Sequence, residues 1–249
     1  MKMSPTLSAT VLMFACEAAS ATPVFWTDWT TSTATNGFTG NGIITTGTAT
    51  VQVTYNNPQG IAFFQNGTGG TDFWTSGGIR NNATSPYTSA LVDNIPTGND
   101  LVALRYAGNQ TLLFSQAVAN PVFSYVSLNG NGYAFNQDFD ILSFGNGSAN
   151  DTCGYWGCGT SSKSVVDLGG GNFEYLLLGT GEPHGTIRFK GAFDTVSWRS
   201  LSNEDWNGFT VGIQGTAAEV FSNIPEPAIL ALLSLGVVGI GFSHKRKTG

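Results

Sequence analysis

The stretch TATVQVTYNN (residues 48–57) indicates the fold class of this chain. Every second residue from Ala49 to Tyr55 is apolar, and the residues between them are Thr or Gln. Side chains of a β-strand point alternately to opposite faces, so this period of two predicts a strand with one buried face.

Similar short apolar runs recur from Thr22 to Ser222, separated by Gly, Asn and Pro, with no long helical period. Many short strands at a spacing of about 8–12 residues are typical of a β-sandwich. We therefore expect a single antiparallel β-sandwich with jelly-roll-like topology over residues 22–222. The runs are DLVALRYAGNQTLLFSQAV (turned at residues 107–110), NPVFSYVSLNG, AFNQDFDILSF, NFEYLLLG, GTIRFKGAFDTVSW and GFTVGIQG. Gly145 to Ser162 is expected to be one long loop, and long loops within compact domains are often functional.

The composition allows a real hydrophobic core. Only 10% of the 249 residues are charged, whereas 41% are hydrophobic. Residues 22–225 carry six basic and fourteen acidic side chains, a formal net charge of −8. An acidic surface without a Lys/Arg cluster repels phosphate backbones, which argues against nucleic-acid binding.

The first 21 residues have the pattern of a signal peptide. Lys2 supplies a positive start, a short apolar stretch follows, and Ala19-Ser20-Ala21 is an A-x-A cleavage site. We expect cleavage after Ala21. Lipoprotein processing at Cys16 is the alternative, but Met13 and Phe14 are poor residues just before such a site.

The last 27 residues, 223–249, differ sharply from the body. Ala228 to Phe242 carries no charge, and as a helix it would be about 22 Å long, shorter than the roughly 30 Å bilayer core. Lys245, Arg246 and Lys247 follow, and such a basic cluster stays on the cytoplasmic side. We expect a short transmembrane helix with the body outside and an extended segment before it.

This ending resembles the PEP-CTERM sorting signal: Pro225-Glu226-Pro227, then a Leu/Gly-rich stretch, then basic residues. The resemblance implies export in a Gram-negative bacterium that makes extracellular polysaccharide, and processing by exosortase, an integral-membrane cysteine protease. By the same resemblance, Pro225, Glu226 and Pro227 are recognition residues. A plain membrane anchor is the alternative. NPVF, EPHGTIRFKGAFDTVSW and WNGFTVGI also resemble bodies of other PEP-CTERM proteins, which usually have Gly where this chain has Pro183.

Two cysteines remain in the exported body, Cys153 and Cys158, within DTCGYWGCGT. An even pair in an exported chain predicts a disulfide, and a metal or redox pair is the less favoured interpretation. Trp156 lies between them. It is either packed in the core or exposed at the loop tip, where an aromatic ring beside polar groups can stack on sugars.

Asn136, Asp138 and Asp140 lie at every second position, among Phe135, Phe139 and Ile141, and are expected on one face of a strand. Their oxygens are candidate ligands for Ca²⁺, and a solvent-facing polar stripe is the alternative. No other cofactor is expected.

The body offers few catalytic groups. His184 is its only histidine, and no G-x-S-x-G motif accompanies it, so a structural role is expected. Glu174 and Glu182 form a candidate glycosidase pair if they face one another.

We therefore expect an exported, non-catalytic protein of the envelope or extracellular matrix. It would be tethered to the inner membrane by its C-terminal helix before exosortase processes it. A carbohydrate-binding module with extracellular polysaccharide as its partner, or a polysaccharide hydrolase, are the alternatives.

Overall fold

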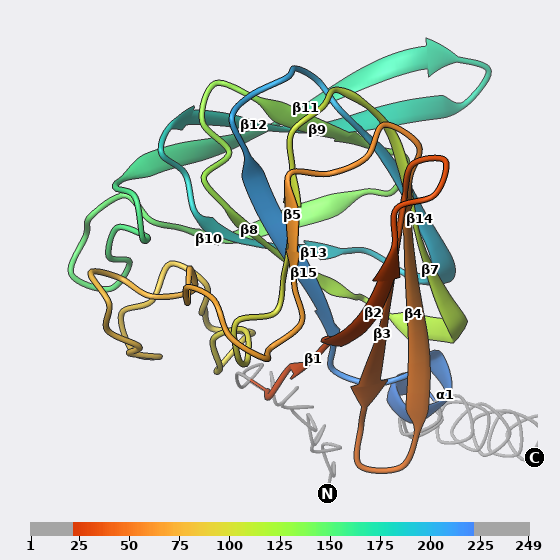
Figure 1. Cartoon of the computed structure of the whole chain (residues 1–249), viewed down its shortest axis with the longest axis horizontal. Coiled ribbons are helices and arrows are strands. Elements are labelled where there is room, and N and C mark those ends of the chain that lie inside the picture. The colour runs from red at the N-terminus through yellow and green to blue at the C-terminus, as the bar shows by residue number, and fades with distance from the viewer. Residues whose placement is uncertain (1–21, 222–249) are drawn as a thin grey trace, which may run out of the picture.

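The computed structural model describes residues 22–221, and these form two antiparallel β-sheets that pack face to face (Figure 1). The seven-stranded sheet has the order β10 (Phe139–Phe144), β13 (Gly185–Phe189), β8 (Val122–Val126), β15 (Asn207–Ile213), β6 (Leu101–Leu104) and β5 (Phe63–Gln65), with β1 (Phe25–Trp26) also paired to β15. The eight-stranded sheet has the order β11 (Gly159–Gly169), β12 (Asn172–Gly181), β9 (Gly132–Phe135), β14 (Ala192–Ser200), β7 (Gly108–Ala119), β4 (Thr50–Asn57), β3 (Phe38–Thr45) and β2 (Asp28–Thr33). A short helix, α1 (Ala217–Phe221), follows β15.

The strand pairing confirms the predicted jelly roll. Four antiparallel pairs are nested along the chain: β6 with β15, β7 with β14, β8 with β13, and β9 with β12. From β6 to β9 the chain changes sheet at every step, and it does so again from β12 to β15. This nesting places strands far apart in sequence side by side, as in a double Greek key. The remaining strands extend the two sheets at their edges.

The core between the sheets is rich in aromatic rings. On β4, Val51, Val53 and Tyr55 are buried and the residues between them are more exposed, as the sequence predicts. The rings of Phe123 on β8 and Phe209 on β15 stack with centroids 4.8 Å apart. Such pairs contribute about 0.5–1.5 kcal/mol each beyond the area they bury, so they help to fix how the sheets pack.

A second hydrophobic cluster lies on the outer face of the seven-stranded sheet. The long connection between β5 and β6 supplies Phe73, Trp74 and Tyr87 to it, and the sheet supplies Leu101 and Ala103. Strand β6 is consequently buried on both faces. The sequence does not predict this cover, because a connection without regular structure has no hydrophobic period.

Three local predictions were wrong. Strands β6 and β7 follow each other in sequence but lie in opposite sheets, so they form no hairpin at residues 107–110. AFNQDFDILSF is not one strand, because residues 136–138 cross from β9 in one sheet to β10 in the other. The loop that begins at Gly145 ends at Cys158, since β11 starts at Gly159.

No helix in the range 22–221 is long and apolar enough to cross a membrane. The expected signal peptide (residues 1–21) and the expected C-terminal transmembrane helix fall outside the described residues.

Candidate functional site

The two candidate catalytic carboxylates do not face one another. Glu174 lies on β12 and Glu182 just beyond its end, so the rise of about 3.3 Å per residue separates them by about 26 Å. Glycosidase carboxylates stand about 5–10 Å apart. The proposed pairing of these two residues is therefore wrong.

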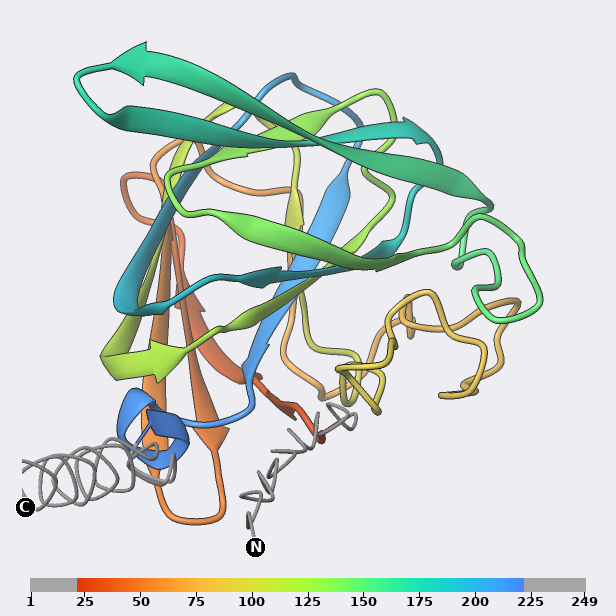
Figure 2. The same cartoon turned by 180° about the vertical axis from the view of Figure 1, so that it is seen from behind.

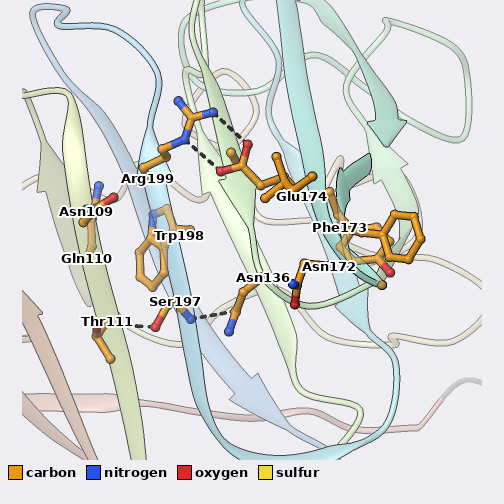
Figure 3. A pocket seen from close by; sticks show the side chains of 14 residues that line it. Asn109, Gln110, Thr111, Asn136, Asn172, Phe173, Glu174, Ser197, Trp198 and Arg199 are labelled. Atoms are coloured by element: carbon orange, nitrogen blue, oxygen red, sulfur yellow. Dashed lines mark hydrogen bonds and ion pairs between the residues drawn. The ribbon is translucent and has the colours of Figure 1, made fainter. Parts of the chain in front are cut away.

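Each of these glutamates is bound by neighbouring side chains instead. Glu174 accepts two hydrogen bonds from the guanidinium of Arg199, at 2.9 and 2.8 Å (Figure 3), and these bonds lower the pKa of Glu174. Glu182 accepts hydrogen bonds from the Ser127 hydroxyl, at 2.6 Å, and from the Asn129 amide. Both carboxylates thus have structural partners.

His184 is completely buried, next to β13. Its Nδ1 lies 3.1 Å from the Tyr87 hydroxyl, and burial lowers the pKa of His184 to about 3. A neutral imidazole without access to solvent is poorly placed to act as a general base on a substrate. The structural role expected for His184 fits this position.

The candidate calcium ligands do not share a strand face. Asn136 and Asp138 lie in the crossing between the sheets, and only Asp140 lies on β10. Asp138 is bound by Lys163 and by Lys190, the latter at 3.2 Å. Burial alone would raise the pKa of Asp138, but hydrogen bonds from the two lysines outweigh it and lower that pKa.

Asp140 is paired as well, with Lys190 at 2.9 Å and Arg188 at 3.9 Å. The structure thus brings ammonium and guanidinium groups to these carboxylates, and among the residues it describes no three His, Cys, Asp or Glu side chains gather as a metal site would require. Calcium binding here stays a prediction.

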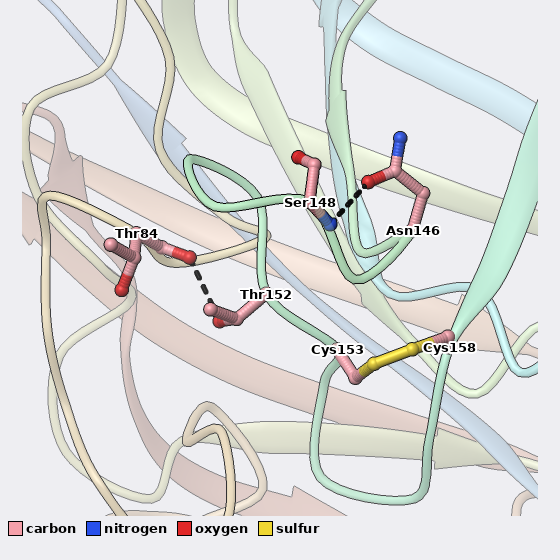
Figure 4. Close-up of a disulfide and its surroundings, with 6 residues drawn as sticks. All are labelled: Thr84, Asn146, Ser148, Thr152, Cys153 and Cys158. Atoms are coloured by element: carbon pink, nitrogen blue, oxygen red, sulfur yellow. Dashed lines mark hydrogen bonds between the residues drawn. A yellow bond between two sulfur atoms is a disulfide. The ribbon is translucent and has the colours of Figure 1, made fainter.

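The loop between Cys153 and Cys158 is closed by a disulfide, as predicted (Figure 4). The two Cα atoms are 4.4 Å apart, and the backbone N–H of Gly154 donates to the carbonyl of Gly157 at 3.0 Å. Gly157 has φ +148°, a conformation that favours glycine. The disulfide, this hydrogen bond and the glycine together fix a tight turn with Trp156 at its tip.

The disulfide loop is also attached to the rest of the domain. The backbone N–H and the hydroxyl of Thr152 both donate to the Thr84 carbonyl at 2.8 Å (Figure 4). Gly154 packs flat on the His184 ring, because a Cβ at Gly154 would lie 2.0 Å from the His184 Cγ. The loop is therefore held in one position against the long connection before β6.

Trp156 is 53% exposed, so the structure places it at the surface rather than in the core. Its ring stacks on Phe73 with centroids 6.2 Å apart, and it meets Tyr155 at 4.8 Å and Trp206 at 6.3 Å. Phe73 in turn contacts Tyr155 at 5.1 Å and Trp206 at 4.8 Å. We call Phe73, Tyr155, Trp156 and Trp206 the aromatic surface.

Phe73 and Trp206 were not predicted as part of this site. They come from the β5–β6 connection and from the segment before β15, and nothing in their local sequence indicates that they meet Trp156. Only the tertiary packing of three separate segments assembles the surface.

The C-terminal segment gives the decisive comparison with known proteins. The profile of the PEP-CTERM protein-sorting motif matches residues 223–247. The chain carries a PEP-CTERM sorting motif. Pro225, Glu226 and Pro227 lie within the match, and so does the basic cluster at Lys245, Arg246 and Lys247. A chain with this motif is exported and sorted to the cell envelope by exosortase.

The PEP-CTERM match covers the C-terminal segment and leaves the sandwich unassigned. Comparison with curated proteins and with solved structures finds no match.

Proposed function

We propose that this protein is a non-catalytic polysaccharide-binding component of the cell envelope or extracellular matrix. Its chain is tethered in the inner membrane by the C-terminal segment until exosortase cleaves at the PEP-CTERM motif. The sandwich is then released to the outside, where extracellular polysaccharide is its partner.

The exposed ring of Trp156 carries the binding part of this proposal. Contiguous exposed apolar patches mark interaction sites, and Trp156 adjoins the rings of Tyr155 and Trp206. A sugar ring offers an apolar C–H face that can stack on an indole. The disulfide and the ring contacts with Phe73 and Trp206 hold Trp156 in place before any ligand binds. Little conformational entropy is therefore lost on binding.

The state of the titratable groups supports a non-catalytic role. Glu174 is paired with Arg199, Glu182 is hydrogen-bonded by Ser127, and His184 is buried with a low pKa. Polysaccharide hydrolysis needs a carboxylic acid and a carboxylate that flank the same glycosidic bond. The two residues that the sequence offered for this pair lie at opposite ends of β12.

Affinity electrophoresis of the purified body in gels that contain the host's extracellular polysaccharide tests the proposal. We expect retardation of the wild type, a loss of at least about tenfold in affinity for Trp156→Ala, and a smaller loss for Trp156→Phe, which keeps a ring. Phe221→Ala is the matched control, because Phe221 is also an exposed ring, at 42%, and lies on α1 outside the aromatic surface.

A reducing-end assay on the same mixtures separates binding from hydrolysis. We expect no reducing ends above those of the polysaccharide alone. Equal binding by wild type and Trp156→Ala would contradict the binding surface, and steady release of reducing ends would show a hydrolase.

A further inference from the structure

A cleft of about 780 Å³ lies on the outer face of the eight-stranded sheet. Its floor crosses β12, β9, β14 and β7, and the tip of the β11–β12 hairpin forms one wall (Figure 3). We call it the hairpin cleft. Its volume falls within the range of about 300–1,000 Å³ that is usual for small-molecule sites.

The floor of the hairpin cleft presents neutral hydrogen-bonding groups. Asn109, Thr111, Asn136 and Ser197 line it with amides and hydroxyls. The Oδ1 of Asn136 accepts from the Ser197 backbone N–H at 2.9 Å, which fixes the orientation of the amide. The Nδ2 of Asn136 donates to no other group within the described residues, so both of its N–H groups remain for a ligand. The fixed amide of Asn136 and the neighbouring hydroxyls suit a ligand that is rich in hydroxyl groups.

The charges of the hairpin cleft cancel. Arg199 and Glu174 are its charged side chains, and they form a two-bonded ion pair with one another at one end of the cleft (Figure 3). The surrounding body has a net charge of −8 from its six basic and fourteen acidic side chains. A polyanion would be repelled by this body and would find no free cation in the cleft. The ligand that fits is neutral.

The hairpin tip adds an apolar wall. Phe173 and Leu168 are 42% and 59% exposed, and both line the cleft. An apolar wall above a floor of amides matches the two aspects of a sugar ring, a C–H face and an edge of hydroxyls. The geometry therefore fits a segment of a neutral glycan.

The hairpin cleft and the aromatic surface are far apart. The disulfide loop ends at Cys158, immediately before β11, and the hairpin tip follows the other end of β11. The eleven residues of that strand span about 33 Å. Figures 1 and 2 show the disulfide loop and the hairpin tip at opposite ends of the molecule.

The two sites also lie on different sheets. Phe73 and Trp206 pack on the outer side of the seven-stranded sheet, whereas the floor of the cleft belongs to the eight-stranded sheet. We propose that the hairpin cleft is a second glycan site, specific for neutral chains, and that one domain thereby bridges two polysaccharide chains. This inference rests on the proposed function, because the aromatic surface supplies the first site. Two linked sites raise avidity and can cross-link a network.

A two-step capture assay tests bridging. The host's extracellular polysaccharide is separated by ion exchange into neutral and acidic fractions. The protein is loaded onto beads that carry the neutral fraction, and capture of fluorescent neutral polysaccharide from solution is measured. We expect capture by the wild type, competition by unlabelled neutral polysaccharide, and no competition by the acidic fraction.

Three variants make the test specific. Phe173→Ala removes the apolar wall, Ser197→Trp fills the cleft, and Trp156→Ala removes the first site. We expect each single variant to remain on the beads with about tenfold weaker binding and to lose capture, and the combined Trp156→Ala/Ser197→Trp variant to lose both. The control Phe221→Ala should behave as the wild type.

The outcomes separate the two claims. Capture that persists in both Phe173→Ala and Ser197→Trp, with Trp156→Ala impaired, would overturn the second site and leave the proposed function standing. Failure of the wild type to bind the neutral beads would overturn the second site, and failure to bind beads that carry either fraction would overturn the proposed function as well. Bridging could also come from a dimer in which each subunit binds one polysaccharide chain through its aromatic surface. Such a dimer would still capture polysaccharide when the cleft is blocked, so loss of capture by Ser197→Trp excludes it.

Discussion

The indole of Trp156 stacks on the ring of Phe73, with centroids 6.2 Å apart and an angle of 28° between the ring planes. Trp156 comes from the disulfide loop and Phe73 from the long connection before β6. Because Phe73 is itself almost buried, it supplies a rigid base under an exposed ring. A ring held in this way can bind the flat apolar face of a ligand without loss of side-chain conformational entropy.

Gly154 should be essential for the position of the disulfide loop. Alanine there would place its Cβ 2.0 Å from the His184 Cγ, so the loop or the buried ring must move. We expect Gly154→Ala to lower the free energy of unfolding by about 1–3 kcal/mol, measured by urea denaturation. Gly47→Ala is the matched control, since nothing lies within 4 Å of its Cβ. Equal stability of the two variants would show that the loop does not press on His184.

His184 should make the fold sensitive to acid. Its pKa is about 3 in the folded protein and about 6.5 when unfolded, so between these values the unfolded chain binds the extra proton. Stability from this group is complete above about pH 6.5 and is lost as the pH falls toward 3, by about 1.4 kcal/mol per pH unit.

The His184 contribution is measured as the difference between wild type and His184→Gln in urea titrations from pH 7 to 4. Burial raises the pKa of Asp100 and Asp151 to about 6 and that of Glu204 to about 7. Through these carboxyls a fall in pH stabilises the folded state, which is the opposite of the effect of His184. These carboxyls are present in both proteins, so they cancel in the difference. Parallel pH profiles would contradict a buried neutral imidazole.

The disulfide should stabilise the fold modestly and hold Trp156. The closed loop between Cys153 and Cys158 is short, so breaking it should cost toward the low end of about 2–4 kcal/mol. We expect a reductant to lower the melting temperature of the wild type and to have no effect on the Cys153→Ser/Cys158→Ser variant. Two free thiols in protein recovered from the native host would contradict the disulfide.

Replacing Pro225, Glu226 and Pro227 with alanine should block processing. These residues lie inside the matched motif, which is the part of the chain that we expect exosortase to recognise. We expect a longer form that stays with the inner membrane fraction, as shown by mass and fractionation. Ser222→Ala, just outside the match, should be processed normally. Unchanged mass and location of the triple variant in a strain with exosortase would remove the recognition role.

The sequence predicted what depends on local pattern. The period of two in residues 48–57 identified a strand with one buried face, and the regular spacing of short strands predicted the sandwich. The even pair of Cys153 and Cys158 in an exported body predicted the disulfide, and Pro225-Glu226-Pro227 with the basic tail predicted the sorting motif.

The parts that could not be predicted depend on long-range packing. Asp138 lies two residues from both Asn136 and Asp140, as on one face of a strand, but its segment crosses between the sheets, where Lys163 binds it. Glu174 and Glu182 are close in sequence, yet the same extended strand that joins them keeps them apart. The meeting of Trp156 with Trp206 depends on which strands pair, and no local pattern contains that information.

The most direct test of the central claim is the intact mass of the protein recovered from the extracellular polysaccharide of its native host. We expect the protein there, bound to polysaccharide, with a mass that ends near Pro225. A mass that still includes Lys245 to Gly249, found only in the inner membrane fraction, would contradict it.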